Sequence, residues 1–456
     1  MNWVKWLYPG MKLKRWLFLF SLGVMVSALG LAMLFNYQVI SVLEEAIFRL
    51  LFQATGRYSV TTLMLAGGAI LLLGLLAMVF ATRRLVQSMV QALIPDSREK
   101  LVERLFAMRK RDKGPAVVVV GGGTGLSVLL RGMKFLTANC TAVVTTADDG
   151  GSSGRLREEL GIIPPGDLRN CLVALADTEP LMEKLMQHRF GGSSALGGHS
   201  FGNLFIAAMA QVVGDMEQGL KATSKVLKVR GQVLPSTLAS VKLEATLADG
   251  VQVVGESNIP ALGQKIVKVE LLPSDPPAVA SSVAAIEKAD LLVFGPGSLY
   301  TSIIPNLLVP GIRDAVMKSQ AVRIYICNVM TQPGETDGYT AADHLQAIVD
   351  HVGGNPIDYV LVNRQLVTPG LQEKYAGQAA FPVDVDTARI EALGSQVVEA
   401  DLISQTDLVR HDPVKLAQAV WGLVYRLGLK SGIKLFDYYY IRQAMRNMRT
   451  LRRRGN

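Results

Sequence analysis

Residues 117–125 read VVVVGGGTG and lead into the apolar segment Leu126–Met133. Four consecutive β-branched residues predict a buried strand, and the glycines predict a tight turn into a helix. Backbone N–H groups and the positive end of the helix dipole converge at such a turn, which suits it to hold phosphate. The candidate phosphate-binding residues are Gly122, Gly123, Thr124 and Gly125. Because Leu126 replaces the third glycine of the dinucleotide fingerprint, a turn that merely needs glycine is the alternative.

Length and composition limit the number of domains and the classes of ligand only broadly. The chain has 456 residues, of which 50% are hydrophobic and 19% charged, so we expect two or three domains with a real core. The net charge of +9 is compatible with nucleic acid, a membrane surface or an anionic small ligand. The three cysteines form no C-x-x-C and the five histidines no H-E-x-x-H, so the sequence favours neither a disulfide framework nor a zinc site.

Two uncharged runs, residues 16–35 and 60–80, have about the length that crosses a bilayer. A signal peptide is the alternative for the first run and a buried helix for the second, but the first run lacks a clear cleavage site. Lys and Arg flank the pair on its outer sides and are scarce between the runs. The positive-inside rule therefore predicts a multi-pass cell-membrane hairpin in residues 1–90, with both termini and the soluble domain in the cytoplasm.

Basic segments follow the hairpin and close the chain. We interpret residues 91–115 as a connector that carries a short basic helix on the membrane surface, with a solvated linker as the alternative. Residues 430–456 form a tail with six arginines behind three tyrosines. Such a segment binds anionic lipid, RNA or DNA. Given the hairpin, we favour membrane lipid and expect no nucleic acid partner, although a solvated tail is also consistent.

Residues 116–429 read as one α/β domain. Short apolar strands at 142–146, 290–294, 322–327 and 358–362 each run into a polar or glycine-rich loop, and helical segments separate them. This alternation predicts a Rossmann-like, doubly wound, mostly parallel sheet. Residues 238–272 instead show hairpin patterning around Asp249–Gly250, which predicts a small β-rich insertion. In doubly wound sheets, ligands bind beyond the carboxyl ends of the strands, where all these loops fall.

The loop at residues 147–157 reads ADDGGSSGRLR. Asp148 and Asp149 form a candidate Mg²⁺ site, or Asp148 a ribose contact, and a helix cap or turn pair is the alternative. We expect Ser152 and Ser153 to offer exposed hydroxyls and Arg155 a fixed positive charge. Acid, donors and arginine within ten residues suit a nucleotide diphosphate better than a core.

Three further loops repeat this composition. PPGDLRN, at 164–170, offers Asp167 and Asn170, while HSFGN, at 199–203, offers His199 and Asn203. Helix capping is the alternative for both. GPGSLYTS, at 295–302, offers amides for phosphate, and its Tyr300 is expected at the loop edge, outside the core, to stack on a base or bond a sugar. The candidate ligand-binding residues of these loops are Asp167, Asn170, His199, Asn203, Gly297, Ser298 and Tyr300.

No recognisable catalytic set accompanies these loops. The sequence has no G-x-x-x-x-G-K-[ST], and no general acid, base or nucleophile stands out. We therefore expect a binding protein rather than an enzyme and assign no catalytic residue. Transfer of a phosphorus-containing group remains the enzymatic alternative, because it can run on positioning and a metal alone.

Several of these stretches together resemble one family. VVVVGGGTGLSVLLRGMK, TTADDGGSSGRLR, PPGDLRN, GGHSFGNL, VLKVRGQVLPST, GPGSLYTSIIPNLLVPGI and CNVMTQPGET are similar to the gluconeogenesis factor family (YvcK-like). This family shares a superfamily with 2-phospho-L-lactate transferase (CofD-like). The resemblance spans Pro115 to about Leu429, and many members lack the hairpin.

The resemblance implies a Rossmann-like sheet that binds UDP-N-acetylglucosamine and regulates cell-envelope precursor synthesis, cell shape and carbon metabolism without a known reaction. Its matching motifs carry over Gly122, Gly123, Thr124, Asp148, Ser153, Asn170, His199 and Asn203, with Tyr300 as the uridine or sugar contact. The transferase branch implies instead a metal-assisted transfer of a phospho-acid group. Envelope-synthesis proteins are the implied partners, and a homo-oligomer is a further possibility.

Overall fold

A computed structural model describes residues 14–34, 45, 49, 52–53, 60–93, 114–177, 180–193, 195–405 and 408–428. The chain divides into two units, residues 1–108 and 109–456. The predicted surface helix in the connector and the arginine-rich tail lie outside the described residues.

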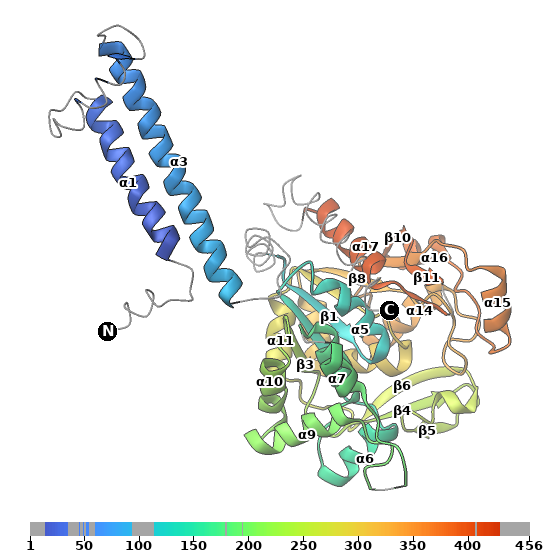
Figure 1. The fold of residues 1–456 in the computed structure, drawn as a ribbon. Coiled ribbons are helices and arrows are strands. Elements are labelled where there is room, and N and C mark those ends of the chain that lie inside the picture. Colours follow the sequence, from blue (N-terminus) through green and yellow to red (C-terminus); the bar gives the residue numbers. More distant parts are fainter. Residues whose placement is uncertain are drawn as a thin grey trace. The chain divides into compact units, whose positions relative to one another are not determined.

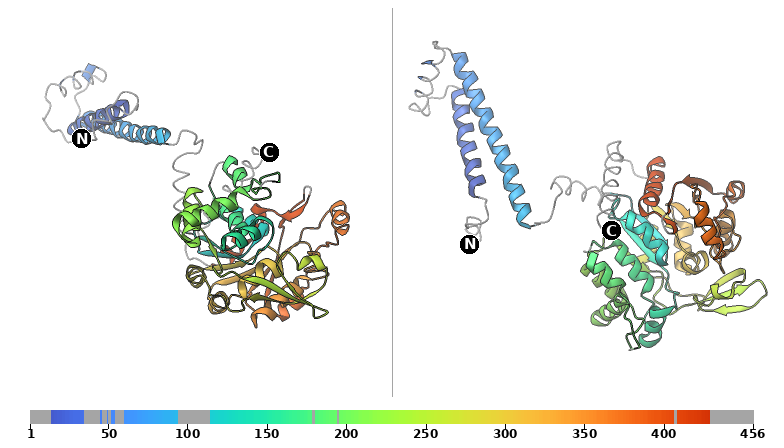
Figure 2. Two further views of the ribbon diagram at one scale, coloured as in Figure 1. Left: turned by 90° about the horizontal axis from the view of Figure 1, so that it is seen from below. Right: turned by 45° about the vertical axis from the view of Figure 1, so that its right-hand side comes forward.

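The N-terminal unit pairs two apolar helices, α1 (Lys14–Leu34) and α3 (Val60–Leu93). Both contain stretches long and apolar enough to cross a membrane, and most of that surface is unburied. The helices lie side by side (Figures 1 and 2) and run antiparallel, since Gly30 faces Gly67 whereas Gly23 faces Gly74. Helix α3 continues 13 residues beyond the predicted end at residue 80.

Small residues let these two backbones approach closely. A Cβ atom on Gly30 would overlap the backbone of Leu71, and one on Gly67 would lie 2.9 Å from the nitrogen of Leu34. Apolar helices in lipid associate through such packing because no hydrophobic effect drives them together. At one end of the pair the rings of Trp16 and Phe80 meet edge to face, with the Arg84 guanidinium 5.7 Å from the Trp16 ring.

The C-terminal unit is built on a seven-stranded sheet in the order β10-β9-β8-β7-β1-β2-β3, and all of its pairings are parallel. This confirms the predicted doubly wound sheet. Its strands are β1 (Val117–Gly121), β2 (Cys140–Val144), β3 (Gln232–Pro235), β7 (Leu291–Phe294), β8 (Val322–Ile326), β9 (Tyr359–Asn363) and β10 (Gln396–Ala400).

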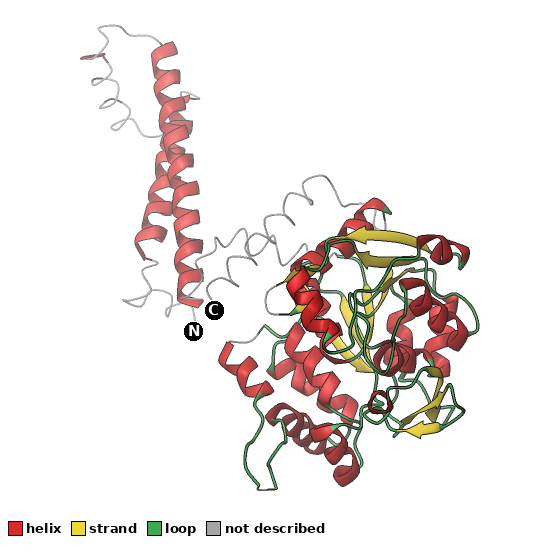
Figure 3. Ribbon diagram, turned by 90° about the vertical axis from the view of Figure 1, so that its right-hand side faces the viewer, coloured by secondary structure: helices red, strands yellow, loops and turns green. Residues whose placement is uncertain are grey.

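Helices cover both faces of the sheet (Figures 1 and 3). Alternate residues of β1 enter the two cores: Val117 and Val119 join one, Val118 and Val120 the other. A strand buried on both faces must be apolar throughout, which explains its run of valines. The helices are α5 (Gly123–Met133), α6 (Gly151–Leu160), α7 (Gly166–Leu175), α8 (Pro180–Gln187), α9 (Phe201–Val213), α10 (Met216–Val226), α11 (Ala280–Glu287), α12 (Ile304–Leu307), α13 (Pro310–Lys318), α14 (Ala341–Val352), α15 (Pro369–Ala376), α16 (Thr387–Ala392) and α17 (Pro413–Arg426).

The predicted β-rich insertion is a separate antiparallel sheet in the order β5-β4-β6. Its strands are β4 (Lys242–Leu247), β5 (Gln252–Val254) and β6 (Ile266–Leu272), and Asp249–Gly250 lies in the turn between β4 and β5 as predicted. Near the C-terminus, β11 (Ile403–Gln405) and β12 (Val409–His411) form a second small antiparallel pair.

The strand order reverses at β1. The chain runs from β1 outward through β2 to β3, then returns to place β7 on the other side of β1. The loops that leave β1 and β7 therefore part toward opposite faces of the sheet, and ligands of doubly wound folds occupy the crevice that this reversal opens.

Candidate functional site

The two predicted glycine loops pack against each other at the reversal point. A Cβ atom on Gly125 would lie 2.6 Å from the carbonyl oxygen of Pro296, in the loop after β7. The Gly297 carbonyl in turn accepts a hydrogen bond from the Asn328 amide, in the loop after β8. Of the predicted residues, the structure brings together Gly122, Gly123, Gly125 and Gly297 here, with the carboxyl group of Asp167; Thr124 and Ser298 belong to the same two loops.

Asp167 lies directly under the first glycine loop. A Cβ atom on Gly122 would lie 2.5 Å from its Oδ2 atom, and the backbone N–H of Gly123 donates to its carboxylate. Burial and the charge of Asp148 raise the pKa of Asp167 to about 7, against the lowering effect of that hydrogen bond. Near neutral pH this carboxyl group can therefore either hold or release a proton.

The neighbours Asp148 and Asp149 face different partners. The Asp148 Oδ1 atom accepts from the backbone N–H of Gly150 at 2.9 Å, and its charge acts on Asp167. Asp149 Oδ1 instead accepts from the N–H and the hydroxyl of Ser257 in the β insertion, at 3.0 and 2.8 Å. In the described part of the chain, no three Asp, Glu, His or Cys residues are grouped to hold a metal ion.

The segment after β2 is not the open polar loop that we expected. Residues 151–160 form helix α6, and Ser152 and Ser153 in its first turn are only 2% and 4% exposed. The expectation of exposed hydroxyls is therefore wrong, because both serines pack against helix α9. The Ser152 hydroxyl lies 3.2 Å from Nδ1 of His199 and accepts from the amide of Asn203 at 3.1 Å.

Arg169, which belongs to the motif PPGDLRN but was not among the predicted ligand-binding residues, lies at the centre of this network. Its Nη1 atom donates to Ser200 Oγ at 2.6 Å and to Asn203 Oδ1 at 2.8 Å. Its Nη2 atom donates to Oδ1 of the predicted residue Asn170 at 2.9 Å. Burial lowers its pKa, partly offset by the charges of Asp167 and Asp148.

Two of the arginines here are buried without a carboxylate partner. No acidic group of the described residues lies within ion-pair distance of Arg169 or Arg157. Among the described residues, Arg157 donates only to the hydroxyl of Ser240, and its buried Nη1 atom has no partner there. The predicted residue Arg155 donates to the Gly197 carbonyl at 2.8 Å. A buried cation with no carboxylate in direct contact favours a bound anion.

Tyr300 lies in the core and not at a loop edge. Its side chain is 2% exposed, and its hydroxyl is bonded to that of Tyr339 at 2.7 Å. Its ring also meets His351 edge to face. The expected location outside the core is therefore wrong, because the π-helical turn Leu299–Ile303 directs this ring inward.

Two glutamates near the crevice were not predicted from the sequence. Glu256 follows β5, accepts from the Thr301 hydroxyl, and has its pKa raised to about 7 by burial and by Asp148. Glu335, after β8, is 5% exposed and its pKa is also raised to about 7, chiefly by burial. Glu335 belongs to the motif CNVMTQPGET, so the sequence could have indicated it as a site residue. Glu256 belongs to none of the motifs that resemble the family, so nothing in the sequence indicated it.

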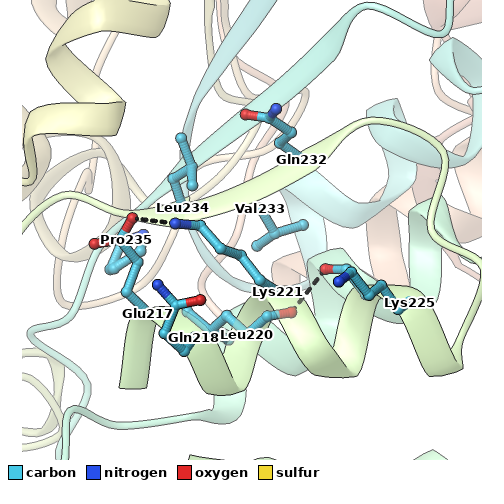
Figure 4. Close-up of a pocket in the computed structure, with 10 residues that line it drawn as sticks. Glu217, Gln218, Leu220, Lys221, Lys225, Gln232, Val233, Leu234 and Pro235 are labelled. Atoms are coloured by element: carbon cyan, nitrogen blue, oxygen red, sulfur yellow. Dashed lines mark hydrogen bonds and ion pairs between the residues drawn. The ribbon is translucent and has the colours of Figure 1, made fainter. Parts of the chain in front are cut away.

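A separate pocket of about 270 Å³ lies between helix α10 and the edge strand β3 (Figure 4). Lys221 crosses it and pairs with Glu217 at 2.8 Å. None of the predicted ligand-binding residues lines this pocket.

These features define a Rossmann-like α/β protein whose glycine, acidic and arginine-bearing loops gather where the strand order reverses. The sequence profile of the family described as "2-phospho-L-lactate transferase CofD" matches residues 117–403. The chain therefore belongs to the CofD family, and within it to the gluconeogenesis factors.

Individual relatives place the chain within that family. It is 51% identical over 311 residues to the "Gluconeogenesis factor" of Bacillus subtilis, across 68% of this chain and 98% of the relative. A relative from Nostoc sp. is 49% identical over 422 residues, across 92% of both chains. A crystal structure of a Bacillus halodurans protein aligns with a TM-score of 0.66 and 52% identity, across 68% of this chain and 100% of that one.

Proposed function

We propose that this protein is a membrane-anchored, cytoplasm-facing binder of UDP-N-acetylglucosamine. In this proposal it reports the level of the nucleotide sugar to cell-envelope synthesis partners and so links carbon metabolism to envelope growth and cell shape. Membership of the gluconeogenesis factors supports a role in carbon metabolism. The ligand is the one that the family resemblance implies.

One observation carries the ligand proposal: the backbone contact between the β1 and β7 glycine loops, which places the start of helix α5 at the crevice. The N-cap residues of helices α5 and α6 are glycines and offer no side-chain cap, and the Gly123 N–H of α5 donates to Asp167. Uncapped helix starts beside buried arginines without carboxylate partners suit a diphosphate.

Calorimetry on the full-length protein in detergent tests the ligand. We expect heat of binding with UDP-N-acetylglucosamine and a clear loss of affinity in Arg169→Lys, which keeps the charge but removes the planar fork of donors. Arg313→Lys is the matched control, because this partly exposed residue of α13 has Asp314 as its one ion-pair partner among the described residues. Absence of heat from the unaltered protein at millimolar ligand would end the ligand proposal.

Reporter fusions test the anchoring. Helices α1 and α3 supply the spans, and the Arg84–Trp16–Phe80 contact resembles the aromatic and cationic belts of membrane interfaces. We expect a periplasm-dependent reporter to be inactive after residue 456 and active between the spans. The opposite pattern would reverse the proposed topology.

A second candidate function is a metal-assisted transfer of a phospho-acid group. It is favoured by the carboxyl groups of Asp148, Asp167 and Glu256, which act on one another at the crevice, and by the description of the matching family. Asp148, with Asp167 or Asp149, would hold Mg²⁺. Formation of product from a deazaflavin acceptor and a guanylylated phospho-acid, dependent on Mg²⁺, would establish this function.

A further inference from the structure

The network between helices α6, α7 and α9 has only one consistent assignment of its hydrogen atoms. It begins at Arg169, whose guanidinium can only donate. Its partner on Asn203 must therefore be the carbonyl oxygen, at 2.8 Å. This fixes the orientation of the Asn203 amide, so its Nδ2 atom is the group that donates to Ser152 Oγ at 3.1 Å.

The bonds of Ser152 in turn determine which atom donates in its hydrogen bond with His199. The Ser152 hydroxyl oxygen accepts from Asn203 Nδ2 and also from the backbone N–H of Ser200 at 3.2 Å. Two donors occupy both acceptor positions of a hydroxyl, so the remaining interaction, with His199 Nδ1 at 3.2 Å, must use the proton of Ser152. Nδ1 is then the acceptor, and the neutral imidazole carries its proton on Nε2.

The Nε2 atom is the free end of this ring. His199 is 4% exposed, and none of the described residues is a hydrogen-bond partner of its Nε2. An atom that was both fully buried and without a partner would be an orphaned polar group, and Nε2 is not one of these. Nε2 therefore keeps some exposed surface. It is therefore the part of an otherwise enclosed imidazole that solvent or a ligand can reach, and it presents an N–H.

We propose that His199 is a hydrogen-bond donor to a phosphoryl oxygen of the bound nucleotide, and that Ser152 is the positioning residue that sets its tautomer. This inference rests on the proposed function. The diphosphate is assigned rather than the sugar because Arg169, in the same network, carries a charge with no carboxylate partner. The first turn of α6, which begins at Gly151 without a side-chain cap, contains Ser152 of this network.

Two substitutions of similar size separate a donor from a packing role. Glutamine places an amide N–H near the position of Nε2, whereas asparagine reaches only the position of Nδ1. In calorimetry on the full-length protein, we expect His199→Asn to weaken UDP-N-acetylglucosamine binding tenfold or more and His199→Gln to keep it within about threefold. Equal losses, or no loss in either variant, overturn the donor role while leaving the proposed function intact if the unaltered protein binds.

A second ligand and a second site complete the test. UDP keeps the diphosphate but lacks the N-acetylglucosamine, so His199→Asn must lower the affinities for UDP and for UDP-N-acetylglucosamine by the same factor. A loss of affinity confined to UDP-N-acetylglucosamine overturns the assignment to the diphosphate. Ser152→Ala must weaken binding in the unaltered background but add nothing in His199→Asn, because the tautomer no longer matters there. Full additivity of the two losses overturns the positioning role. A protein that binds neither ligand overturns the proposed function itself.

Discussion

At the scale of single residues, the crevice depends on positions where a side chain has no room. The contact of Gly125 with the Pro296 backbone is the tightest link between the β1 and β7 loops. Backbone atoms cannot move aside as the end of a flexible side chain can. Glycine here is therefore a requirement of packing, independent of any ligand.

We predict that Gly125→Ala destabilises the protein by about 1–3 kcal/mol, because the added methyl group must push the two loops apart. The expected loss of nucleotide binding is larger than this change in stability alone would cause. Gly422→Ala is the control: it lies in helix α17 with nothing within 4 Å of the added atom, and should stabilise by about 0.5–1 kcal/mol. Urea unfolding of the full chain compares the two, and an equal effect of both would contradict the packing argument.

Glu335 gives the stability a distinct pH dependence. Its pKa is raised from 4.5 to about 7 by burial, so the folded state retains a proton that the unfolded state has already lost. Between pH 4.5 and 7 the free energy of unfolding should therefore fall as pH rises, by about 3 kcal/mol at most from this group.

The Glu335→Gln variant removes this term, since an amide of the same shape carries no proton equilibrium. We expect it to be more stable than the unaltered protein at pH 8 and no more stable at pH 5. Urea titrations at both pH values measure the difference. A variant that loses the same stability at both values would show that the carboxyl group acts through its hydrogen bonds alone.

At the scale of elements, the close pairing of α1 and α3 is open to a direct test. We predict that Gly30→Ala separates the helices locally, because the added atom overlaps the Leu71 backbone. Gly68→Ala is the control and should leave the helices in place, because the atom nearest to its added methyl group is a Leu34 methyl at 3.9 Å. Spin labels at the exposed positions Leu31 and Leu65 report the distance in detergent or lipid. The three native cysteines are buried and should resist labelling. Matching distance distributions in the two variants would exclude glycine packing as the cause.

A second element, the β insertion, is attached to the site through Asp149. We predict that Asp149→Ala loosens the turn at Gly255–Ile259 and speeds its amide hydrogen exchange, since both bonds from Ser257 are lost. Asp149→Asn keeps an acceptor oxygen and should leave the exchange nearly unchanged. If Asp149 served mainly as a metal ligand, the asparagine variant would impair Mg²⁺-dependent behaviour while the turn stayed protected.

The elements also show how far sequence reasoning extends. The valine run of β1 and the Asp-Gly turn were predicted because their signals are local. Helix α6 was read as a loop because Gly and Ser disfavour helix, and packing of Ser152 and Ser153 against α9 overrides that propensity. The position of Tyr300 depends on a π-helical turn, and the role of Arg169 depends on contacts between α7 and the start of α9, so neither follows from local sequence.

At the scale of the whole molecule, the two units have separable sequences. The Bacillus subtilis relative matches this chain over 98% of its own length yet covers only 68% of the chain, whereas the Nostoc relative covers 92%. The family match at residues 117–403 lies wholly within the second unit, and some relatives are about one third shorter than this chain. The sheet and both cores are likewise built from residues after 114.

We therefore predict that a chain of residues 114–456 leaves the membrane fraction but binds UDP-N-acetylglucosamine with the affinity of the full-length protein, within about twofold. The physical reason is that every residue assigned to the crevice lies within the seven-stranded sheet and its loops, and none lies in α1 or α3. Fractionation and calorimetry measure the two properties separately. Retention of the shortened chain on membranes would assign anchoring to the basic tail instead, and a folded but non-binding chain would show that the apolar helices contribute to the site.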